Sequence, residues 1–312
     1  VPVAGDFPDW IEPSLARLLG DDLLPEMRAL AARAPLDLRA NVLKVASRDE
    51  VQDALPHLGA VSTPLSPLGL RIAPSEDGRG PAVQVEPEFL KGWIEIQDEG
   101  SQLASLLSGA KPGDQVVDLC AGGGGKTLAL AAMMRNAGQI YATDNDARRL
   151  APIHDRLARA GVRNVQVRTP RARTDAVSDL DGRIDLVLVD APCTGVGTWR
   201  RNPDAKWRLR PGSLETRRKE QADVLDRAAR LVRPGGRIAY ITCSILSEEN
   251  DDAVSALLQR QSELRVVPAR EIVDAGGLGP LAEKVRFTQY GLQMTPLKTG
   301  TDGFYLAHLT RG

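Results

Sequence analysis

The most constraining feature of this sequence is a regular alternation of apolar strands and helices after residue 100. Short apolar runs predict strands, and the longer stretches between them carry the three-to-four-residue spacing of helices. Strands are expected at 115–120, 139–144, 165–170, 184–190, 236–243 and 302–309. Helices are expected at 101–110, 126–136, 146–161, 213–232 and 247–261. Because uniformly apolar strands are buried on both faces, the pattern predicts an α/β fold with a mostly parallel, doubly wound sheet.

Residues 1–100 follow a different pattern, and we expect them to form a small α+β module. An amphipathic stretch at 13–34 precedes an alternating strand at 38–44 and a helix at 48–59. Further short apolar runs that read as strands lie at 70–73, 81–85 and 93–98. A length of 312 residues fits two domains, so the sequence predicts a division into 1–100 and 101–312.

The composition argues against several classes of protein. No run of about 18 apolar residues is present, and the first residues do not read as a signal peptide, so we expect no membrane span and no secretion signal. The three cysteines (Cys120, Cys193 and Cys243) are too sparse for a disulfide framework, which favours the cytoplasm. The three histidines lack the spacing of zinc ligands, and we expect no metal site.

A glycine-rich segment, DLCAGGGGKT at 118–127, joins an expected strand to an expected helix. It is not a nucleotide-triphosphate loop, because the first glycine of that motif would fall on Cys120, and it does not fit G-x-G-x-x-G either. Such a turn still lets backbone N–H groups approach a carboxylate or phosphate. The next strand ends in Asp144, which either holds two ribose hydroxyls or caps the following helix. A ligand with a carboxylate and a ribose but no phosphate suits S-adenosylmethionine.

Two of the cysteines follow the ends of neighbouring expected strands. Cys193 closes the string DAPC, and Cys243 closes the strand at 236–243. Ligands of open α/β sheets bind beyond the carboxyl ends of strands, so we expect both thiols and Asp190 to face one crevice. A purely structural cysteine belongs more naturally inside a strand, and the pattern therefore favours a functional role for the thiols.

A thiol beside a carboxyl group suits methylation of cytosine at carbon 5. A thiolate that adds to carbon 6 makes carbon 5 nucleophilic towards a methyl sulfonium, and a carboxyl group at ring nitrogen 3 stabilises the shift of charge. Our hypothesis is that Lys126, at a helix start, lowers the pKa of the attacking thiol. The residues alone do not decide which thiol attacks, or whether the substrate is RNA, DNA or a small molecule.

The motifs resemble those of the bacterial ribosomal-RNA cytosine-5 methyltransferases of the Sun/Fmu type, a family that extends to eukaryotic nucleolar enzymes. The matching strings follow the family order and cover the catalytic region almost end to end. They are WIEIQDEGSQLAS (93–105), DLCAGGGGKT (118–127), VDAPCTGVGTWRRNPDAKWR (189–208), PGGRIAYITCSILSEEN (234–250) and TDGFYLA (301–307).

The resemblance implies a Rossmann-like methyltransferase domain at 101–312 and a role for each motif. It implies that Cys243 is the nucleophile, that Cys193 assists product release, and that Asp190 contacts the cytosine. The implied cofactor is S-adenosyl-L-methionine, bound by Cys120, Ala121, Gly122, Gly123, Gly124, Gly125, Lys126, Asp144 and Asp190. Residues 1–100 are then an RRM-like RNA-binding module. The implied partner is ribosomal RNA, with transfer RNA or another nucleic acid as the alternative, and we expect a monomer.

The chain departs from the family pattern at two places. Gly122 and Gly123 stand where the usual loop has Ala and Pro, which predicts a looser backbone. The acid that usually follows the third strand and touches the adenine is missing from RTPRART at 168–174, so no residue is assigned to the adenine.

Charge is unevenly distributed along the chain. The net charge of −1 argues mildly against a nucleic-acid partner. Between residues 199 and 219, however, eight basic and two acidic side chains give a local +6, with Trp199 and Trp207 among them. Arginines with interleaved aromatic residues suit a splayed RNA base and its phosphates. A second run at 148–173 has eight arginines and one acid and reads more simply as a solvated face.

Overall fold

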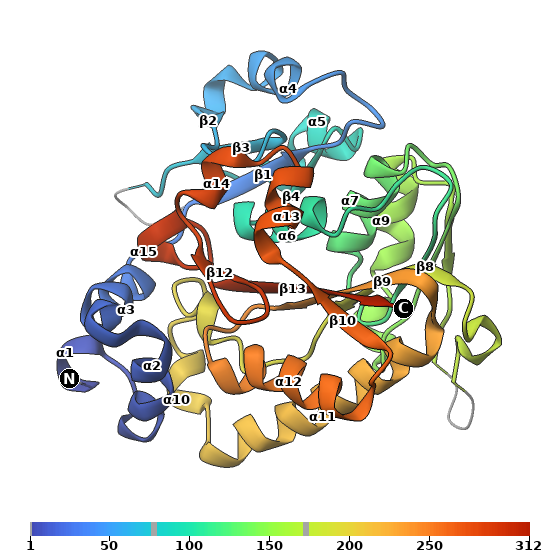
Figure 1. Ribbon diagram of the computed structural model, residues 1–312. Coiled ribbons are helices and arrows are strands. Elements are labelled where there is room, and N and C mark those ends of the chain that lie inside the picture. Colours follow the sequence, from blue (N-terminus) through green and yellow to red (C-terminus); the bar gives the residue numbers. More distant parts are fainter. Residues whose placement is uncertain (1, 76–79, 171–174) are drawn as a thin grey trace. The chain divides into compact units, whose positions relative to one another are not determined.

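The structure is a computed structural model that describes residues 2–75, 80–170 and 175–312 (Figure 1). Contacts divide the chain into two compact units, which are described separately here. The central unit comprises Pro35–Leu188 and Leu231–Arg233. The terminal unit comprises Val1–Ala34, Val189–Arg230 and Pro234–Gly312, and therefore contains both ends of the sequence.

The central unit begins with a small antiparallel sheet in the strand order β2-β3-β1-β4. Its strands are β1 (Leu36–Ala40), β2 (Val61–Ser62), β3 (Gly69–Ile72) and β4 (Ile94–Ile96). Two helices complete a strand-helix-strand-strand-helix-strand series: α4 (Arg48–Ala54) and α5 (Pro87–Leu90). Alternate strand positions, among them Leu38, Leu70 and Ile94, form one apolar core with Val51 of α4.

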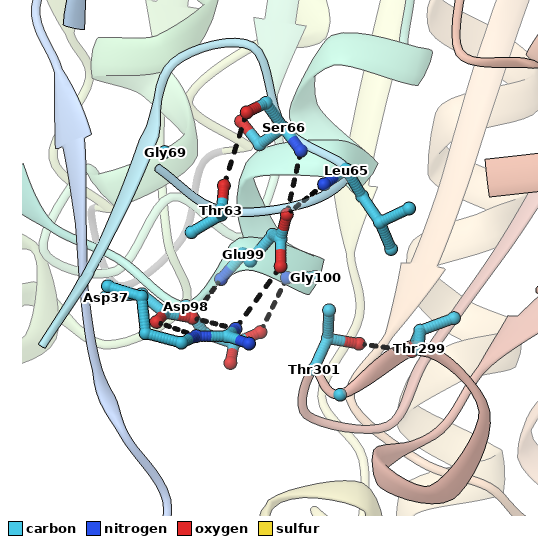
Figure 2. Close-up of polar contacts among 12 residues, drawn as sticks. Asp37, Thr63, Leu65, Ser66, Gly69, Asp98, Glu99, Gly100, Thr299 and Thr301 are labelled. Atoms are coloured by element: carbon cyan, nitrogen blue, oxygen red, sulfur yellow. Dashed lines mark hydrogen bonds and ion pairs between the residues drawn. The ribbon is translucent and has the colours of Figure 1, made fainter. Parts of the chain in front are cut away.

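The opposite face of this small sheet carries charged residues, and it is buried as well. Asp37 accepts two hydrogen bonds from the Arg71 guanidinium, at 2.7 and 2.8 Å. Arg71 also donates to Glu99 at 3.2 Å. Figure 2 shows the Glu99 carboxylate pointing at the backbone N–H groups of Leu65 and Ser66, which donate to it at 2.7 and 2.8 Å. Buried charges are tolerated when they are paired in this way, so the face is an internal polar layer.

This polar layer bears on the RNA-binding role expected for residues 1–100. RRM-type modules stack bases on aromatic side chains of their sheet. Strands β1 and β3 read LDLRA and GLRI and contain no aromatic residue. Arg39 of β1 and Glu95 of β4 are each 2% exposed. The face therefore offers no platform for a base, and both the likeness to an RRM and the RNA binding stay predictions.

The second half of the central unit is a parallel arrangement of strands in the order β8-β5-β6-β7. The strands are β5 (Gln115–Asp118), β6 (Gln139–Ala142), β7 (Val165–Val167) and β8 (Ile184–Asp190). The helices are α6 (Glu99–Leu107), α7 (Gly125–Met133), α8 (Ala147–Leu150) and α9 (Ile153–Ala160). β8 leaves the central unit at Val189, so that its last two residues belong to the terminal unit.

The strands of the terminal unit pair antiparallel. The long strand β13 (Phe304–Arg311) pairs with three others: β9 (Val232–Thr242), β10 (Leu264–Val267) and β12 (Leu292–Met294). β12 pairs in turn with β11 (Arg286–Phe287). The register sets Tyr305 opposite Thr242, which places the end of β9 next to the start of β13.

Helices of the terminal unit come from both ends of the chain. The early ones are α1 (Pro2–Gly5), α2 (Glu12–Leu19) and α3 (Leu23–Ala31). The later ones are α10 (Ala205–Arg208), α11 (Pro211–Leu231), α12 (Asp251–Arg260), α13 (Ala269–Ala275), α14 (Gly279–Ala282) and α15 (Pro296–Thr299). Phe7, Ile11 and Met27 pack in one core with Trp199 and Ile245, so the first 34 residues support loops that lie some 200 residues later.

The α/β fold class is confirmed, and the sheet is mixed. The pairs β5-β6, β5-β8 and β6-β7 are parallel, whereas the pairs formed by the strands after β9 are antiparallel. Strands β10, β11 and β12 were not expected, since each has four residues or fewer and gives no clear periodicity. The expected strand at 81–85 is wrong: it contains the 3-10 helix Val83–Val85.

The boundary expected between residues 100 and 101 stays a prediction. Contacts place residues 35–100 with 101–188 in the central unit, and residues 1–34 with the terminal unit. Among the described helices, none is both long and apolar enough to span a bilayer.

Candidate active site

Two thiols of the terminal unit meet just beyond the ends of β8 and β9. β9 ends directly before Cys243, and β8 ends three residues before Cys193. The backbone N–H of Ala191 donates to the carbonyl of Ile241 at 2.8 Å, which holds the two strand ends side by side. The Sγ atoms of Cys193 and Cys243 lie 3.3 Å apart and share a hydrogen bond. Neither cysteine forms a disulfide, and both are half-buried.

The surroundings of the sulfur pair favour the protonated form of Cys193. Its pKa is raised well above the ordinary value, first by the hydrogen bond with Cys243 and then by burial. The charges of Cys243 and Glu249 raise the pKa of Cys193 further. Either sulfur can donate the hydrogen bond that joins the two.

The backbone around Cys243 is fixed by close contacts. Its carbonyl accepts a hydrogen bond from the N–H of Gly197 at 3.0 Å. The carbonyl of Gly197 in turn accepts from the N–H of Gly303 at 2.8 Å. A Cβ atom at Gly197 would lie 2.2 Å from the Gly303 carbonyl oxygen, so this crossing requires glycine. The two thiols are thus held on a backbone that has little freedom to move.

Asp190 and Lys126 are the other two residues expected to take part in catalysis. Asp190 is the last residue of β8 and is half-buried. Lys126 lies in the first turn of α7 and is 8% exposed. Lys126 belongs to the central unit and the thiols to the terminal unit, so its effect on a thiol pKa stays a prediction.

The glycine-rich loop of the central unit turns sharply between β5 and α7. Gly122 and Gly124 have φ values of +49° and +85°, in the left-handed region that favours glycine. A Cβ atom at Gly124 would lie 2.5 Å from Cγ1 of Ile153, so glycine is required there for space as well. After the loop, the Thr127 hydroxyl donates to Asp118 at 2.7 Å and ties the start of α7 to the end of β5.

Asp144 follows β6 and supports the loop from the side. One of its carboxylate oxygens accepts from the N–H of Gly122 at 2.9 Å, and the other accepts from the N–H of Asp146 at 2.9 Å. The N-cap of α8 is Asp146, which accepts from the N–H of Arg148. Asp144 therefore does more than cap the helix. Each of its oxygens keeps a lone pair for a further donor, as ribose binding requires.

Arg156 of α9 braces the same loop from a second direction. Its Nη1 donates to the carbonyl of Gly123 at 2.7 Å, and its Nη2 contacts Glu95 at 3.0 Å. Glu95 also accepts from Arg159 at 2.5 Å. The loop was expected to be loose because Gly122 and Gly123 replace Ala and Pro. The structure supplies two side-chain anchors, Asp144 and Arg156, at these two positions.

The basic run at 199–219 is less open to RNA than expected. Trp199 is 2% exposed and packs in the core, so the expectation that it stacks on an RNA base is wrong. Arg200 is buried against Asp302, and Lys206 is buried against Asp6. Trp207, which is 54% exposed, retains the surface position that base stacking needs.

The second basic run also contains internal pairs. Arg168 contacts Asp179 at 2.5 Å and lies 4.5 Å from the ring centroid of Tyr141. Positions 171–174 of the RTPRART string lie outside the described residues. Within the described ranges, no group of three or more histidine, cysteine, aspartate or glutamate side chains is arranged to hold a metal ion.

Residues 105–310 match the family described as 16S rRNA methyltransferase RsmB/F. The chain is 31% identical over 308 residues to the probable ribosomal RNA small subunit methyltransferase B of Synechocystis, covering 98% of this chain and 67% of that protein. It is 35% identical over 230 residues to ribosomal RNA small subunit methyltransferase B of Erwinia tasmaniensis, covering 74% of this chain and 50% of that protein. The crystal structure of PH0851 has a TM-score of 0.86 at 32% identity, covering 99% of this chain and 67% of the other.

The chain belongs to the RsmB/F methyltransferase family. The resemblance drawn from the motifs is thereby confirmed, together with the Rossmann-like methyltransferase fold. The chain spans between about half and two thirds of the length of the relatives described above.

Two residues that hold functional loops in place, Glu249 and Arg156, were not identified from the sequence. Glu249 is fully buried and contacts the loop that bears Cys193. Arg156 lay inside a run interpreted as a solvated face. A signal for Glu249 was present, because an acidic pair followed by Asn comes six residues after the strand-end cysteine. Nothing in the sequence marked Arg156, because its partner carbonyl lies 33 residues away.

Proposed function

We propose that this chain is an RNA cytosine-5 methyltransferase that acts on ribosomal RNA. The observation that carries the proposal is the pair of thiols, 3.3 Å apart, at the ends of β8 and β9 in a member of the RsmB/F family. A methyltransferase for oxygen or nitrogen atoms needs no thiol nucleophile, whereas carbon 5 of cytosine must first be activated by addition at carbon 6.

The cofactor of the proposed reaction is S-adenosyl-L-methionine, which supplies an electrophilic methyl group. The residues proposed to hold it are those of the glycine-rich loop with the two acids: Cys120, Ala121, Gly122, Gly123, Gly124, Gly125, Lys126, Asp144 and Asp190. Three features of the central unit fit this group: the left-handed glycines that bring backbone close to a ligand, the start of α7 after them, and the remaining lone pairs of Asp144.

In the proposed mechanism, the Cys243 thiolate attacks carbon 6 of the target cytosine. A new carbon–sulfur bond forms, and electron density moves through carbon 5 and the ring to nitrogen 3, which takes up a proton from the Asp190 carboxyl group. Carbon 5 would then take the methyl group of the bound cofactor, which would leave as the neutral thioether S-adenosylhomocysteine, while nitrogen 3 returns its proton to Asp190. Carbon 5 loses its proton to a base, and the carbon–sulfur bond breaks to restore the aromatic ring and the Cys243 thiolate.

Cys193 is proposed to act at the release step. Its pKa is raised chiefly by its hydrogen bond with Cys243. Once the Cys243 sulfur is bonded to carbon 6, its negative charge is gone and this cause weakens. Cys193 therefore loses its proton more readily in the covalent adduct than in the free enzyme, when a base is required to take the proton from carbon 5.

We further propose that the chain acts as a monomer in the cytoplasm, with RNA as its partner. The target base must leave its stack to reach the thiols, so single-stranded or bulged RNA is the substrate form we expect. The exposed residues Trp207, Arg208 and Arg210 are candidates for the surface that receives it.

Methyl transfer to separate nucleic acids tests the proposed function. The chain is incubated with radiolabelled cofactor and with small-subunit ribosomal RNA, transfer RNA or duplex DNA, and the product is digested to nucleosides. We expect 5-methylcytidine from ribosomal RNA only. If only transfer RNA is labelled, transfer RNA takes the place of ribosomal RNA as the proposed substrate. Labelling of DNA alone, or of no cytosine in any of the three nucleic acids, would overturn the proposal.

A further inference from the structure

The residue that follows Cys193 is bonded to a buried carboxylate, that of Glu249. The backbone N–H of Thr194 donates to Oε1 of Glu249 at 2.7 Å, and the Thr194 hydroxyl donates to Oε2 at 2.5 Å. Glu249 ends the 3-10 helix Ser247–Glu249, in the loop that follows Cys243. Thr194 comes directly after Cys193, so one side chain joins the two thiol-bearing loops.

Glu249 is itself held in place by its neighbours. Gln221 of α11 donates to Oε1 of Glu249 at 3.4 Å and to the carbonyl of Pro192 at 2.9 Å. The Tyr240 hydroxyl donates to the backbone carbonyl of Glu249 at 2.6 Å. Glu249 and Gln221 are both 0% exposed. A carboxyl group removed from water in this way is costly unless every oxygen is bonded, and here both oxygens accept hydrogen bonds.

We propose that Glu249 is a positioning residue that holds the Cys193 and Cys243 loops together through Thr194, and so keeps the two sulfur atoms within hydrogen-bond distance. This role rests on the proposed two-thiol function. It assigns no contact with the substrate to Glu249. The side chain acts on the spacing of the sulfurs and, through its charge, on the acidity of the Cys193 thiol.

The charge of Glu249 has a definite direction of effect. It is one of the causes that raise the pKa of Cys193, after the bond with Cys243 and burial. Cys243 also acts on the Cys193 thiol through its charge, in the same direction. Removing the Glu249 charge, or letting the loops separate, therefore makes Cys193 more acidic and more reactive.

Competitive alkylation of the two cysteines tests the proposal in the full chain without RNA or cofactor. The rates at which iodoacetamide modifies Cys193 and Cys243 are measured by mass spectrometry between pH 6 and 10. We expect Glu249→Gln and Thr194→Val each to raise the Cys193 rate relative to the Cys243 rate by about tenfold, which corresponds to about one pKa unit. The pH midpoint of Cys193 alkylation should move down in both variants.

Two further variants serve as controls. Thr198→Val removes a hydroxyl from the same loop, but that hydroxyl donates to the carbonyl of Gly195 at 2.9 Å and not to Glu249. We expect Thr198→Val to leave the ratio of the two rates unchanged within about twofold. Thr194→Ser keeps the hydroxyl and should restore the wild-type ratio. A folded Glu249→Gln variant with wild-type rates and midpoint would overturn the proposal, as would a Thr194→Val variant that matches Thr198→Val.

The result of the alkylation experiment can be distinguished from the result of the methylation experiment. Alkylation needs no substrate, so a shifted ratio in a chain that methylates no RNA would preserve the role of Glu249 and reject the activity. Methylation of RNA with an unchanged ratio would preserve the activity and reject the role. If Glu249→Gln does not fold, the comparison of Thr194→Val with Thr194→Ser decides the matter, because Thr194 is only half-buried.

Discussion

The glycine-rich loop and the two-thiol region are built in different ways. The loop of the central unit is formed by backbone: left-handed glycines set its path, and Asp144 and Arg156 bind its N–H and carbonyl groups. The two-thiol region of the terminal unit also has close backbone contacts, and in addition the Glu249 side chain holds two loops together. We therefore expect the glycine-rich loop to be most sensitive to changes of backbone conformation. The two-thiol region should be strongly sensitive to changes of side chain as well.

The largest expected effect is at Cys243. Cys243→Ala removes the proposed nucleophile, and we expect methyl transfer to fall by about 10³-fold or more, with loss of any covalent protein–RNA adduct. Binding of S-adenosylhomocysteine, measured by calorimetry, should stay at the wild-type value because the loop is untouched. Retention of adduct formation in this variant would show that Cys243 is not the nucleophile.

Cys193→Ala should separate attack from release. Turnover is expected to stop after one event, because the proton at carbon 5 is no longer removed and the adduct with Cys243 cannot resolve. Denaturing gel electrophoresis with labelled RNA should show a complex that persists in Cys193→Ala and is absent from Cys243→Ala. The reverse pattern would exchange the roles of the two thiols.

Gly124→Ala tests how strongly the glycine-rich loop depends on its backbone conformation. The substitution adds a Cβ atom 2.5 Å from Ile153 at a φ of +85°, and we expect a loss of about 2–4 kcal/mol in the free energy of unfolding. Gly113→Ala is the matched control, since its φ is +94° with nothing within 4 Å of the added Cβ. It should cost only the backbone strain, about 1–2 kcal/mol. Chemical denaturation measures both, and equal losses would show that the packing at Gly124 has no effect.

His308 makes the stability of the terminal unit sensitive to acid. Burial first, and the charge of Arg237 second, lower its pKa from 6.5 to about 3. Between these two pH values the unfolded chain binds a proton at this residue and the folded chain does not. The contribution of His308 to the free energy of unfolding therefore falls as pH drops below 6.5, with a limiting slope of about 1.4 kcal/mol per pH unit.

Comparison with variants isolates this contribution. His308→Gln should unfold with a shallower dependence on pH than the wild type between pH 6 and 4. His154→Gln, at an exposed position of the central unit, is the control variant for the loss of a histidine. Identical slopes for wild type and His308→Gln would rule out a buried neutral imidazole.

The smallest expected effect is at Arg156. Arg156→Lys keeps the charge, but a lysine cannot donate to Gly123 and Glu95 from two separate nitrogen atoms as the guanidinium does. We expect the affinity for S-adenosylhomocysteine, measured by calorimetry, to be about threefold to tenfold weaker. Arg163→Lys, at an exposed position, is the control and should bind as the wild type does. The double variant Gly122→Ala with Gly123→Pro restores the residues usual in the family. It tests whether the contact of Arg156 with Gly123 replaces the stiffness that the proline would give the loop. In this background, Arg156→Lys should lower the affinity for S-adenosylhomocysteine by a smaller factor.

Local patterns were enough to predict much of the fold. The strands at 115–118, 139–142 and 184–190 are continuous apolar runs, and the helices between them show clear periodicity. Local patterns could not predict which strands pair when these lie far apart in the sequence. The antiparallel strands after β9 are short, and their partner β13 is the last element of the chain. The small sheet was expected, but not that its Asp37 and Glu95 would be buried in a polar layer.

The sequence by itself determined the chemistry available to this protein: two thiols at strand ends, a glycine-rich turn before a helix, and acids after the strands on either side. These features are local, because chain neighbours and strand periodicity fix them. Only the tertiary structure decided which groups act together. The bond between Thr194 and Glu249 spans 55 residues, and the contact of Phe7 with the core around Trp199 spans far more. Burial and hydrogen-bond partners arise from such contacts. They raise the pKa of the Cys193 thiol and hold the glycine-rich loop in place.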